Sequence, residues 1–273
     1  MSAEAPDRAR GTGRAFEAAR REGRGAFIGY LTSGFPTLRE SDRLVHAACE
    51  AGADVLELGV PFSDPVADGP VIQRTTQAAL EQGATLAGVL RQVERLRAAH
   101  PTPVVLMSYL NPIHRYGIDR FASAAASAGV DGLILIDLPP DEDSDTWETL
   151  AGAGLDTITL ATPTTSPERL AAIAARAGGF LYIVARLGVT GSGGADTATA
   201  SLLDRCRAIS PLPRAIGFGI TLESDLAPYR GKAEGIIVGS GLLQPMLDEP
   251  DAATRERNLR AQVTAFREKA KEL

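Results

Sequence analysis

Two carboxylates, Glu57 and Asp68, are the first candidates for chemistry. Glu57 is the one acidic residue of the apolar run 55–60. Because successive side chains of a β-strand point to opposite faces, Glu57 lies opposite the bulky Leu56 and Leu58 and is expected on an inner face. Loss of water there raises the pKa of a carboxyl and suits it to general acid–base catalysis near neutral pH. The alternative, a structural hydrogen bond, is less favoured because an idle buried carboxylate is costly.

Asp68 belongs to the segment that follows this run, residues 61–70, which reads Pro-Phe-Ser-Asp-Pro-Val-Ala-Asp-Gly-Pro. Taken alone, Asp64 and Asp68 could cap a turn or the helix expected near Val71. If the run ends in a strand, however, Asp68 lies on the same rim as Glu57. The sequence therefore predicts a two-carboxylate pair.

Glycine ends or follows the last three aliphatic runs. The segments are Gly188-Val189-Thr190-Gly191, Gly217-Phe218-Gly219 and Gly239-Ser240-Gly241. Bare backbone N–H groups, with a helix beginning near Ser240, can bind a phosphate dianion without a lysine. Neither the Walker motif nor the dinucleotide motif Gly-x-Gly-x-x-Gly fits these segments. We therefore expect a phosphate site.

The scarcity of lysine, histidine and cysteine narrows the chemistry further. A Schiff-base aldolase needs a lysine in its active site, yet the lysines lie in a turn before the last run and in the terminal helix, at Lys232, Lys269 and Lys271. No metal site is expected from the scattered histidines and cysteines, His46, His100, His114, Cys49 and Cys206. What remains is cofactor-free acid–base chemistry on a phosphorylated small molecule. If a carbon–carbon bond breaks, the substrate itself must supply the electron sink.

A short repeat marks the elements that must position these residues. Ala-Gly-x-Asp recurs at 51–54, 128–131 and 153–156, with a looser copy at 177–180. Each copy follows an alanine-rich helical segment and precedes an aliphatic run, so its glycine is expected in the left-handed conformation that ends a helix. The aliphatic runs predict strands at Ala26–Thr32, Asp54–Val60, Pro103–Tyr109, Gly132–Asp137, Asp156–Thr162, Phe180–Ala185, Arg214–Ile220 and Gly235–Gly239.

Strands that are apolar on both faces and separated by helices indicate a parallel sheet covered throughout. Eight βα units in about 250 residues predict an α/β fold, a single (β/α)8 (TIM) barrel, whose active site lies at the C-terminal ends of its strands. Residues 14–22 predict an extra N-terminal helix on the surface. We divide the chain into a flexible tail, 1–12, and one barrel domain, 13–273.

Charge and hydropathy exclude other classes. The net charge of −6 comes without a basic stripe, which argues against nucleic acid and anionic membrane as partners. The longest aliphatic runs are far shorter than the roughly 18 residues of a membrane span. With two cysteines and no secretory signal pattern, a cytoplasmic location is expected.

The segment 56–70 closely resembles the signature of the tryptophan synthase alpha chain family. Further segments resemble the family in the same order, at 30–34, 111–117, 137–139, 188–191 and 217–220. The resemblance thus covers nearly the whole chain. It implies a barrel lyase that splits indole-3-glycerol phosphate into indole and glyceraldehyde 3-phosphate.

The resemblance also implies roles for matched positions. Glu57 corresponds to the general acid that protonates indole C3 and then takes the glycerol hydroxyl proton. Asp68 corresponds to the group that steadies the indole N–H as positive charge develops. Tyr182 matches a tyrosine that lines the site, and Thr190 matches a loop that closes on Asp68. The phosphate cradle corresponds to Gly191, Gly219, Gly239 and Ser240.

A partner is implied as well. Alpha chains of this family work in an alpha2beta2 heterotetramer with a beta chain that uses pyridoxal phosphate, and they need no cofactor of their own. Three proline-containing rim loops, at 61–62, 111–113 and 138–140, are expected to expose apolar residues for docking. Two departures from the family are Phe35, where many members have Asp, and a glycine-rich stretch at 192–194.

Three alternatives stay open at this point. One is a stand-alone indole-3-glycerol-phosphate lyase without a beta chain. Another is a cofactor-free sugar-phosphate isomerase, which would also use paired acids and a phosphate corner. The third is a regulatory subunit that binds ligand without turnover. Release of indole by the purified protein separates the first from the other two.

Overall fold

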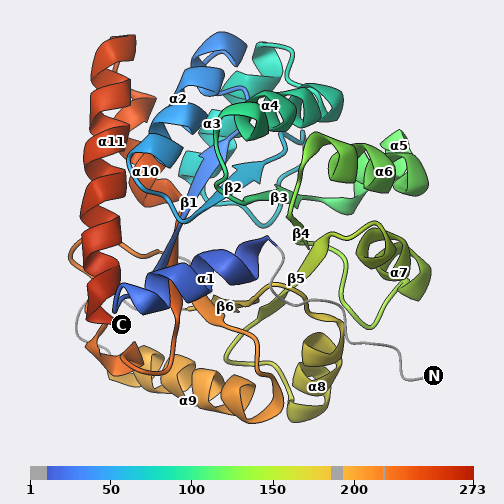
Figure 1. Cartoon of the computed structure of the whole chain (residues 1–273), viewed down its shortest axis with the longest axis vertical. Coiled ribbons are helices and arrows are strands. Elements are labelled where there is room, and N and C mark those ends of the chain that lie inside the picture. Colours follow the sequence, from blue (N-terminus) through green and yellow to red (C-terminus); the bar gives the residue numbers. More distant parts are fainter. Residues whose placement is uncertain (1–10, 186–192, 218) are drawn as a thin grey trace.

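The computed structural model describes residues 11–185, 193–217 and 219–273. Within these residues, eight parallel strands pair in sequence order and close into a barrel (Figure 1). The closing pair places Ala26 of the first strand opposite Gly235 of the last. Each strand lies inside its predicted range: β1 Ala26–Thr32, β2 Val55–Gly59, β3 Val104–Ser108, β4 Gly132–Leu135, β5 Asp156–Ala161, β6 Leu181–Val184, β7 Arg214–Gly217 and β8 Gly235–Val238. The (β/α)8 prediction is confirmed.

Helices form the outer layer around this ring. The long C-terminal helix α11 runs beside α2 and α10 (Figure 1). The helices after the first are α2 Leu38–Glu50, α3 Pro70–Glu81, α4 Leu86–Ala99, α5 Leu110–Tyr116, α6 Ile118–Ala128, α7 Ser144–Gly152, α8 Pro167–Arg176, α9 Gly193–Ile209, α10 Ser240–Leu247 and α11 Ala252–Lys269, with short 3₁₀ turns η1 Ala227–Tyr229 and η2 Ala270–Glu272.

The strands divide the core into two layers. Their outward side chains, Leu56 and Leu58 among them, pack against the helices. Their inward side chains fill the barrel itself, and this inner cluster consists of Ala26, Ile28, Val55, Val105, Ile134, Ile158, Phe180, Ala215 and Ile237 together with Phe16 and Ala19. Alternation along the strands thus produces an apolar interior, as the pattern of β2 predicted.

The N-terminal helix α1, Thr12–Arg21, differs from the surface helix expected at 14–22. Phe16 and Ala19 are buried, and the Phe16 ring lies 5.3 Å from that of Phe180 in the barrel core. The helix begins at Thr12, inside the segment 1–12 that was expected to be a tail. The Thr12 hydroxyl donates a hydrogen bond to Asp156 at 2.7 Å. Spacing within 14–22 could not show this, because the surface that buries α1 comes from distant strands.

In the Ala-Gly-x-Asp repeat, both the glycine and the aspartate have a structural role. Gly52, Gly129 and Gly154 have φ of 103°, 86° and 86°, which confirms the predicted left-handed glycine. In two copies of the repeat, the acid accepts a backbone N–H near the start of the preceding strand: Asp54 accepts from Phe27 at 2.8 Å and Asp131 from Val104 at 2.9 Å. In the third copy, Asp156 accepts from the Thr12 hydroxyl instead. Asp54 and Asp131 each therefore satisfy a backbone donor near the beginning of a strand.

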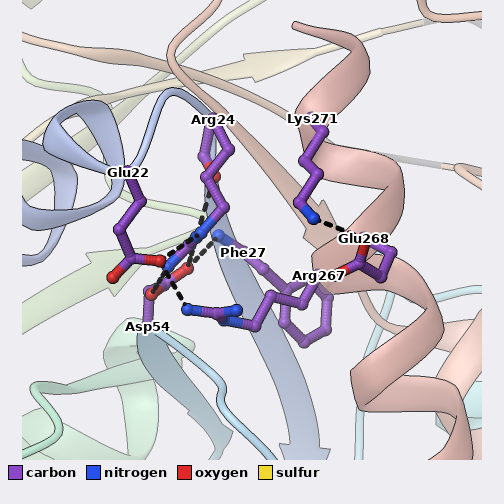
Figure 2. Close-up of polar contacts among 8 residues, drawn as sticks. Glu22, Arg24, Phe27, Asp54, Arg267, Glu268 and Lys271 are labelled. Atoms are coloured by element: carbon purple, nitrogen blue, oxygen red, sulfur yellow. Dashed lines mark hydrogen bonds and ion pairs between the residues drawn. The ribbon is translucent and has the colours of Figure 1, made fainter.

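Asp54 also anchors a charge cluster at the N-terminal end of the barrel. Figure 2 shows its carboxylate facing both the Phe27 N–H and the guanidinium of Arg24. The Arg24 bonds are bidentate, at 2.5 and 2.8 Å, and the Arg24 side chain is only 1% exposed. Glu22 joins Arg24 to Arg267 of α11, at 3.0 and 2.7 Å. The cluster thus ties together α1, the first two strands and the terminal helix.

Replacing Asp54 should cost substantial stability. Asp54→Asn leaves the buried Arg24 guanidinium without its bidentate partner, and breaking such a buried pair costs about 3 kcal/mol. Urea unfolding measures this loss. The control Glu17→Gln removes an exposed ion pair with Arg20 and should change stability by less than about 1 kcal/mol. Equal effects of the two variants would contradict a special role for Asp54.

Candidate active site

Glu57 lies inside the barrel, one step above the apolar inner layer. It is 1% exposed and pairs in register with Tyr30 of β1. Its Oε2 atom has no hydrogen-bond partner among the described residues. Burial raises the pKa of Glu57 to about 8, and the negative charge of Asp68 adds to the shift. A carboxyl at this depth that keeps its proton at neutral pH can act as a proton donor toward the cavity that it lines.

Asp68 belongs to the loop between β2 and α3 and is half-buried. Its backbone N–H donates to the Pro65 carbonyl at 3.1 Å, and its own carbonyl accepts from Gln73 of α3 at 2.8 Å. Burial raises the pKa of Asp68 to about 6, against the opposing effect of a hydrogen bond from Tyr109. Asp68 therefore ionises at lower pH than Glu57. Asp64 of the same loop is exposed and lines an outer groove instead.

One cavity joins the two acids. Its volume is about 280 Å³, and it opens at the C-terminal ends of the strands. Of the residues predicted from the sequence to form the site, the structure brings these to its wall: Glu57, Asp68, Tyr182, Gly219, Gly239 and Ser240. Thr190 and Gly191 lie outside the described residues. Their roles stay predictions.

The corner of this cavity formed by β7 and β8 can hold an anion. Helix α10 begins at Ser240, with Gly239 as its N-cap, so its first N–H groups lack intrahelical carbonyl partners. Among the described residues, a Cβ at Gly239 would meet Tyr30 and Ile72 only at 3.5 Å or more, and a Cβ at Gly219 would meet no atom within 4 Å. The backbone here is bare and faces open space, which suits a phosphate group.

Several lining residues were missed by sequence reasoning. Tyr30, Met107 and Ile237 share the cavity wall with Glu57. A signal for them exists, because each occupies an inward position of its predicted strand, alternating with outward residues. The alternating pattern does not show, however, which inward residues line the cavity and which belong to the packed layer beneath it.

Two glycines make room for the tyrosines of this wall. A Cβ on Gly59 would overlap the Tyr30 hydroxyl, and one on Gly217 would come within 2.5 Å of the Tyr182 hydroxyl. Tyr30 is buried and Tyr182 is partly buried, and loss of water raises the pKa of each hydroxyl. They therefore stay neutral at physiological pH and form a polar-edged, otherwise apolar wall beside Glu57.

The three histidines are not among the residues that line the cavity. His46 and His100 contact each other, with ring nitrogens 2.9 Å apart. His114, expected in a loop, is part of α5, because the helix begins immediately after Tyr109. In residues 11–185, 193–217 and 219–273, no three His, Cys, Asp or Glu side chains gather in a way that could hold a metal ion. No helix in the same residues is long and apolar enough to cross a membrane.

Comparison with known proteins connects this geometry to a family. A sequence model described as tryptophan synthase alpha chain matches residues 16–273. The chain belongs to the tryptophan synthase alpha chain family. The tryptophan synthase alpha chain of Xylella fastidiosa strain 9a5c is 44% identical over 255 residues, which cover 93% of this chain and 95% of the relative. That of Desulfosudis oleivorans is 44% identical over 232 residues, 84% of this chain and 88% of the relative.

Solved structures agree with this assignment. Tryptophan synthase subunit alpha from Legionella pneumophila strain Paris superposes with a TM-score of 0.86 at 36% identity, covering 95% of this chain and 98% of that one. A chain of Mycobacterium tuberculosis tryptophan synthase gives a TM-score of 0.85 at 36% identity, with the same coverage. The chain is therefore a lyase of tryptophan biosynthesis, as expected for a tryptophan synthase alpha chain.

Gly217→Ala should impair the site without unfolding the barrel. The new methyl group displaces the Tyr182 hydroxyl, and overpacking of this kind costs about 1–3 kcal/mol. We expect kcat/KM for indole-3-glycerol phosphate, the substrate that the family resemblance implies, to fall about tenfold or more. Gly152→Ala is the matched control, since a Cβ at Gly152 meets nothing within 4 Å. Unchanged kinetics for a folded Gly217→Ala variant would show that Tyr182 is not held by this contact.

Proposed function

We propose that the cavity cleaves indole-3-glycerol phosphate into indole and glyceraldehyde 3-phosphate, with Glu57 and Asp68 as the reacting acid–base pair. The observation that carries the proposal is that two carboxyls with different degrees of burial face one cavity whose other corner is bare backbone at a helix start. Such a cavity can hold the indole ring between the acids and the phosphate at the corner.

In the proposed reaction, the neutral Glu57 carboxyl first gives its proton to indole C3. The ring nitrogen then carries positive charge, which the ionised Asp68 carboxylate stabilises through the indole N–H. The Glu57 carboxylate next takes the proton of the adjacent glycerol hydroxyl. The bond between C3 and the side chain breaks, its electron pair restores the indole ring, and the hydroxyl carbon becomes an aldehyde. Glu57 ends protonated, so the cycle is closed.

The order of the two pKa values supports these roles. With the pKa of Glu57 raised to about 8 and that of Asp68 to about 6, the pair at neutral pH holds one proton, and that proton is on Glu57. Two similar groups placed in different surroundings thus serve as acid and as anion. In the proposal, the substrate phosphate binds the backbone at Gly219, Gly239 and Ser240, and the closing loop contributes Thr190 and Gly191. The protonated indole is the electron sink, so the chain needs no cofactor.

The proposed partner is a beta chain that carries pyridoxal phosphate, in an alpha2beta2 heterotetramer in the cytoplasm. The tryptophan synthase structures from Mycobacterium tuberculosis among the relatives support a partner of this kind. The expected docking loops need correction, however. Ile113 and Leu138 are 0% and 6% exposed and belong to the core, because α5 and the 138–140 turn fold inward. Val66, 88% exposed beside a groove of about 740 Å³, is the prominent apolar residue of this rim.

Removing the proposed acid should nearly abolish cleavage. Glu57→Gln preserves shape but supplies no acidic proton, and a positioned general acid–base contributes about 10²–10⁴-fold. The assay is indole release from indole-3-glycerol phosphate by purified protein. Asp64→Asn, on the exposed side of the same rim, should retain cleavage within about threefold. Absence of indole release by the wild-type protein would instead favour the isomerase or the regulatory subunit.

The pH dependence of kcat/KM should be bell-shaped. Protonation of Asp68 removes the stabilising anion, so the rate falls below about pH 6; ionisation of Glu57 removes the acid, so the rate falls above about pH 8. Because the two acids interact, the limbs report the pair as a whole. Steady-state kinetics of the lone chain from pH 5 to 9.5 measures both limbs. A rate that still rises between pH 8 and 9 would contradict a protonated Glu57.

A further inference from the structure

We propose that Tyr109 is a positioning residue for Asp68. In this inference its hydroxyl accepts a hydrogen bond from the backbone N–H of Ala67 and directs its own proton to the Asp68 carboxylate. The inference rests on the proposed function, since it concerns the anion that faces the indole N–H. Tyr109 does not line the cavity; it acts through Asp68.

The geometry at Tyr109 joins the loop of Asp68 to the barrel. Tyr109 follows β3 directly, is the N-cap of α5, and is 3% exposed. Its hydroxyl accepts from the Ala67 N–H at 3.0 Å, one residue before the proposed anion. Its ring lies 5.3 Å from that of Phe62, at the start of the same loop. The phenol therefore holds both the beginning and the functional end of this loop.

The chemistry of a phenol determines where its proton goes. A tyrosine hydroxyl has one O–H to donate and accepts with its lone pairs. The Ala67 N–H donates to the Tyr109 hydroxyl oxygen, which leaves the hydroxyl proton available. The neighbouring Asp68 carboxylate is a charged acceptor, and hydrogen bonds to charged acceptors are the strongest. Burial raises the pKa of Tyr109, so the hydroxyl keeps its proton, and hydrogen bonding from it lowers the pKa of Asp68.

Hydrogen bonds around its backbone hold Tyr109 in place. The Ser108 hydroxyl donates to the Tyr109 carbonyl at 2.9 Å, and the Ser108 carbonyl accepts from the Ile136 N–H at 3.1 Å. The next N–H, of Leu110, donates to Asp137 at 2.7 Å. The phenol thus takes its position from the third and fourth strands. It transmits that position to the loop through the Ala67 N–H and the Phe62 ring.

Other charged groups near this pair must be kept unchanged in any test. Glu57 and Tyr30 interact electrostatically with Asp68 from the first two strands, and Asp137 with Tyr109 from the far side. Tyr109→Phe leaves all of them in place and keeps the ring against Phe62. It removes only the hydroxyl, so a change in Asp68 can be assigned to that group.

The test is Tyr109→Phe, measured in two ways. First, a ¹³C-carboxyl NMR titration of the unliganded protein should show the pKa of Asp68 rising by about one pH unit, because the carboxylate loses a donor. Second, kcat for indole-3-glycerol phosphate should fall about tenfold or more with KM within about threefold, and the acid limb of the rate profile should move to higher pH. In an Asp68→Asn background, Tyr109→Phe should add less than about twofold.

Tyr116→Phe is the control, since Tyr116 ends the helix that Tyr109 caps but contacts Phe121 and Arg120. It should leave both readouts unchanged. A folded Tyr109→Phe variant with the wild-type pKa of Asp68, or one that loses activity without a moved acid limb, overturns the inference. The NMR readout needs no substrate, so it separates this failure from a failure of the proposed reaction, which would show as absent cleavage by the wild-type chain.

Discussion

The burial of one carboxyl, Glu57, constrains the rest of the structure. Its Oε2 has no partner among the described residues, and the layer beneath it is aliphatic and aromatic. A carboxyl whose pKa is about 8 in the folded chain and 4.5 without that environment takes up a proton when the chain folds at neutral pH. The unfolded chain ionises first as pH rises, so this carboxyl lowers stability across that interval, by a few kcal/mol at neutral pH. The barrel must supply that stability elsewhere.

The fold supplies it at the opposite end. There, acids at the strand starts accept backbone N–H groups, Asp54 binds Arg24, and α1 covers the inner core with Phe16. The Arg24 and Asp54 charges at this end are paired, whereas Oε2 of Glu57 at the mouth has no hydrogen-bond partner in the part of the chain that the structure describes. This division follows the usual polarity of the barrel, in which one face stabilises and the other carries the chemistry. Asp68 lies between these extremes, half-buried on a loop whose position depends on Tyr109.

The sequence predicts a residue's position correctly where the direction of its side chain follows from the local periodicity. Alternation along 55–60 placed Glu57 inward, and the Ala-Gly-x-Asp repeat located the helix ends and the strand starts. It failed where burial depends on partners distant in sequence. Ile113 and Leu138 looked exposed because they lie beside prolines, yet α5 and the 138–140 segment place both side chains in the hydrophobic core. Tyr109 gave no local signal either, since its contact with Ala67 joins two loops that only the closed barrel brings together.

The proposed chemistry requires that Glu57 is neutral at pH 7 while it faces the cavity. Its protonation state can be measured directly by infrared difference spectroscopy of the unliganded protein across a pH series, with the Glu57→Gln spectrum subtracted to isolate this carboxyl. We expect a protonated carboxyl C=O band at pH 7 that disappears with a midpoint near pH 8. A band already absent at pH 6 would show an ionised Glu57 and would contradict its role as the acid.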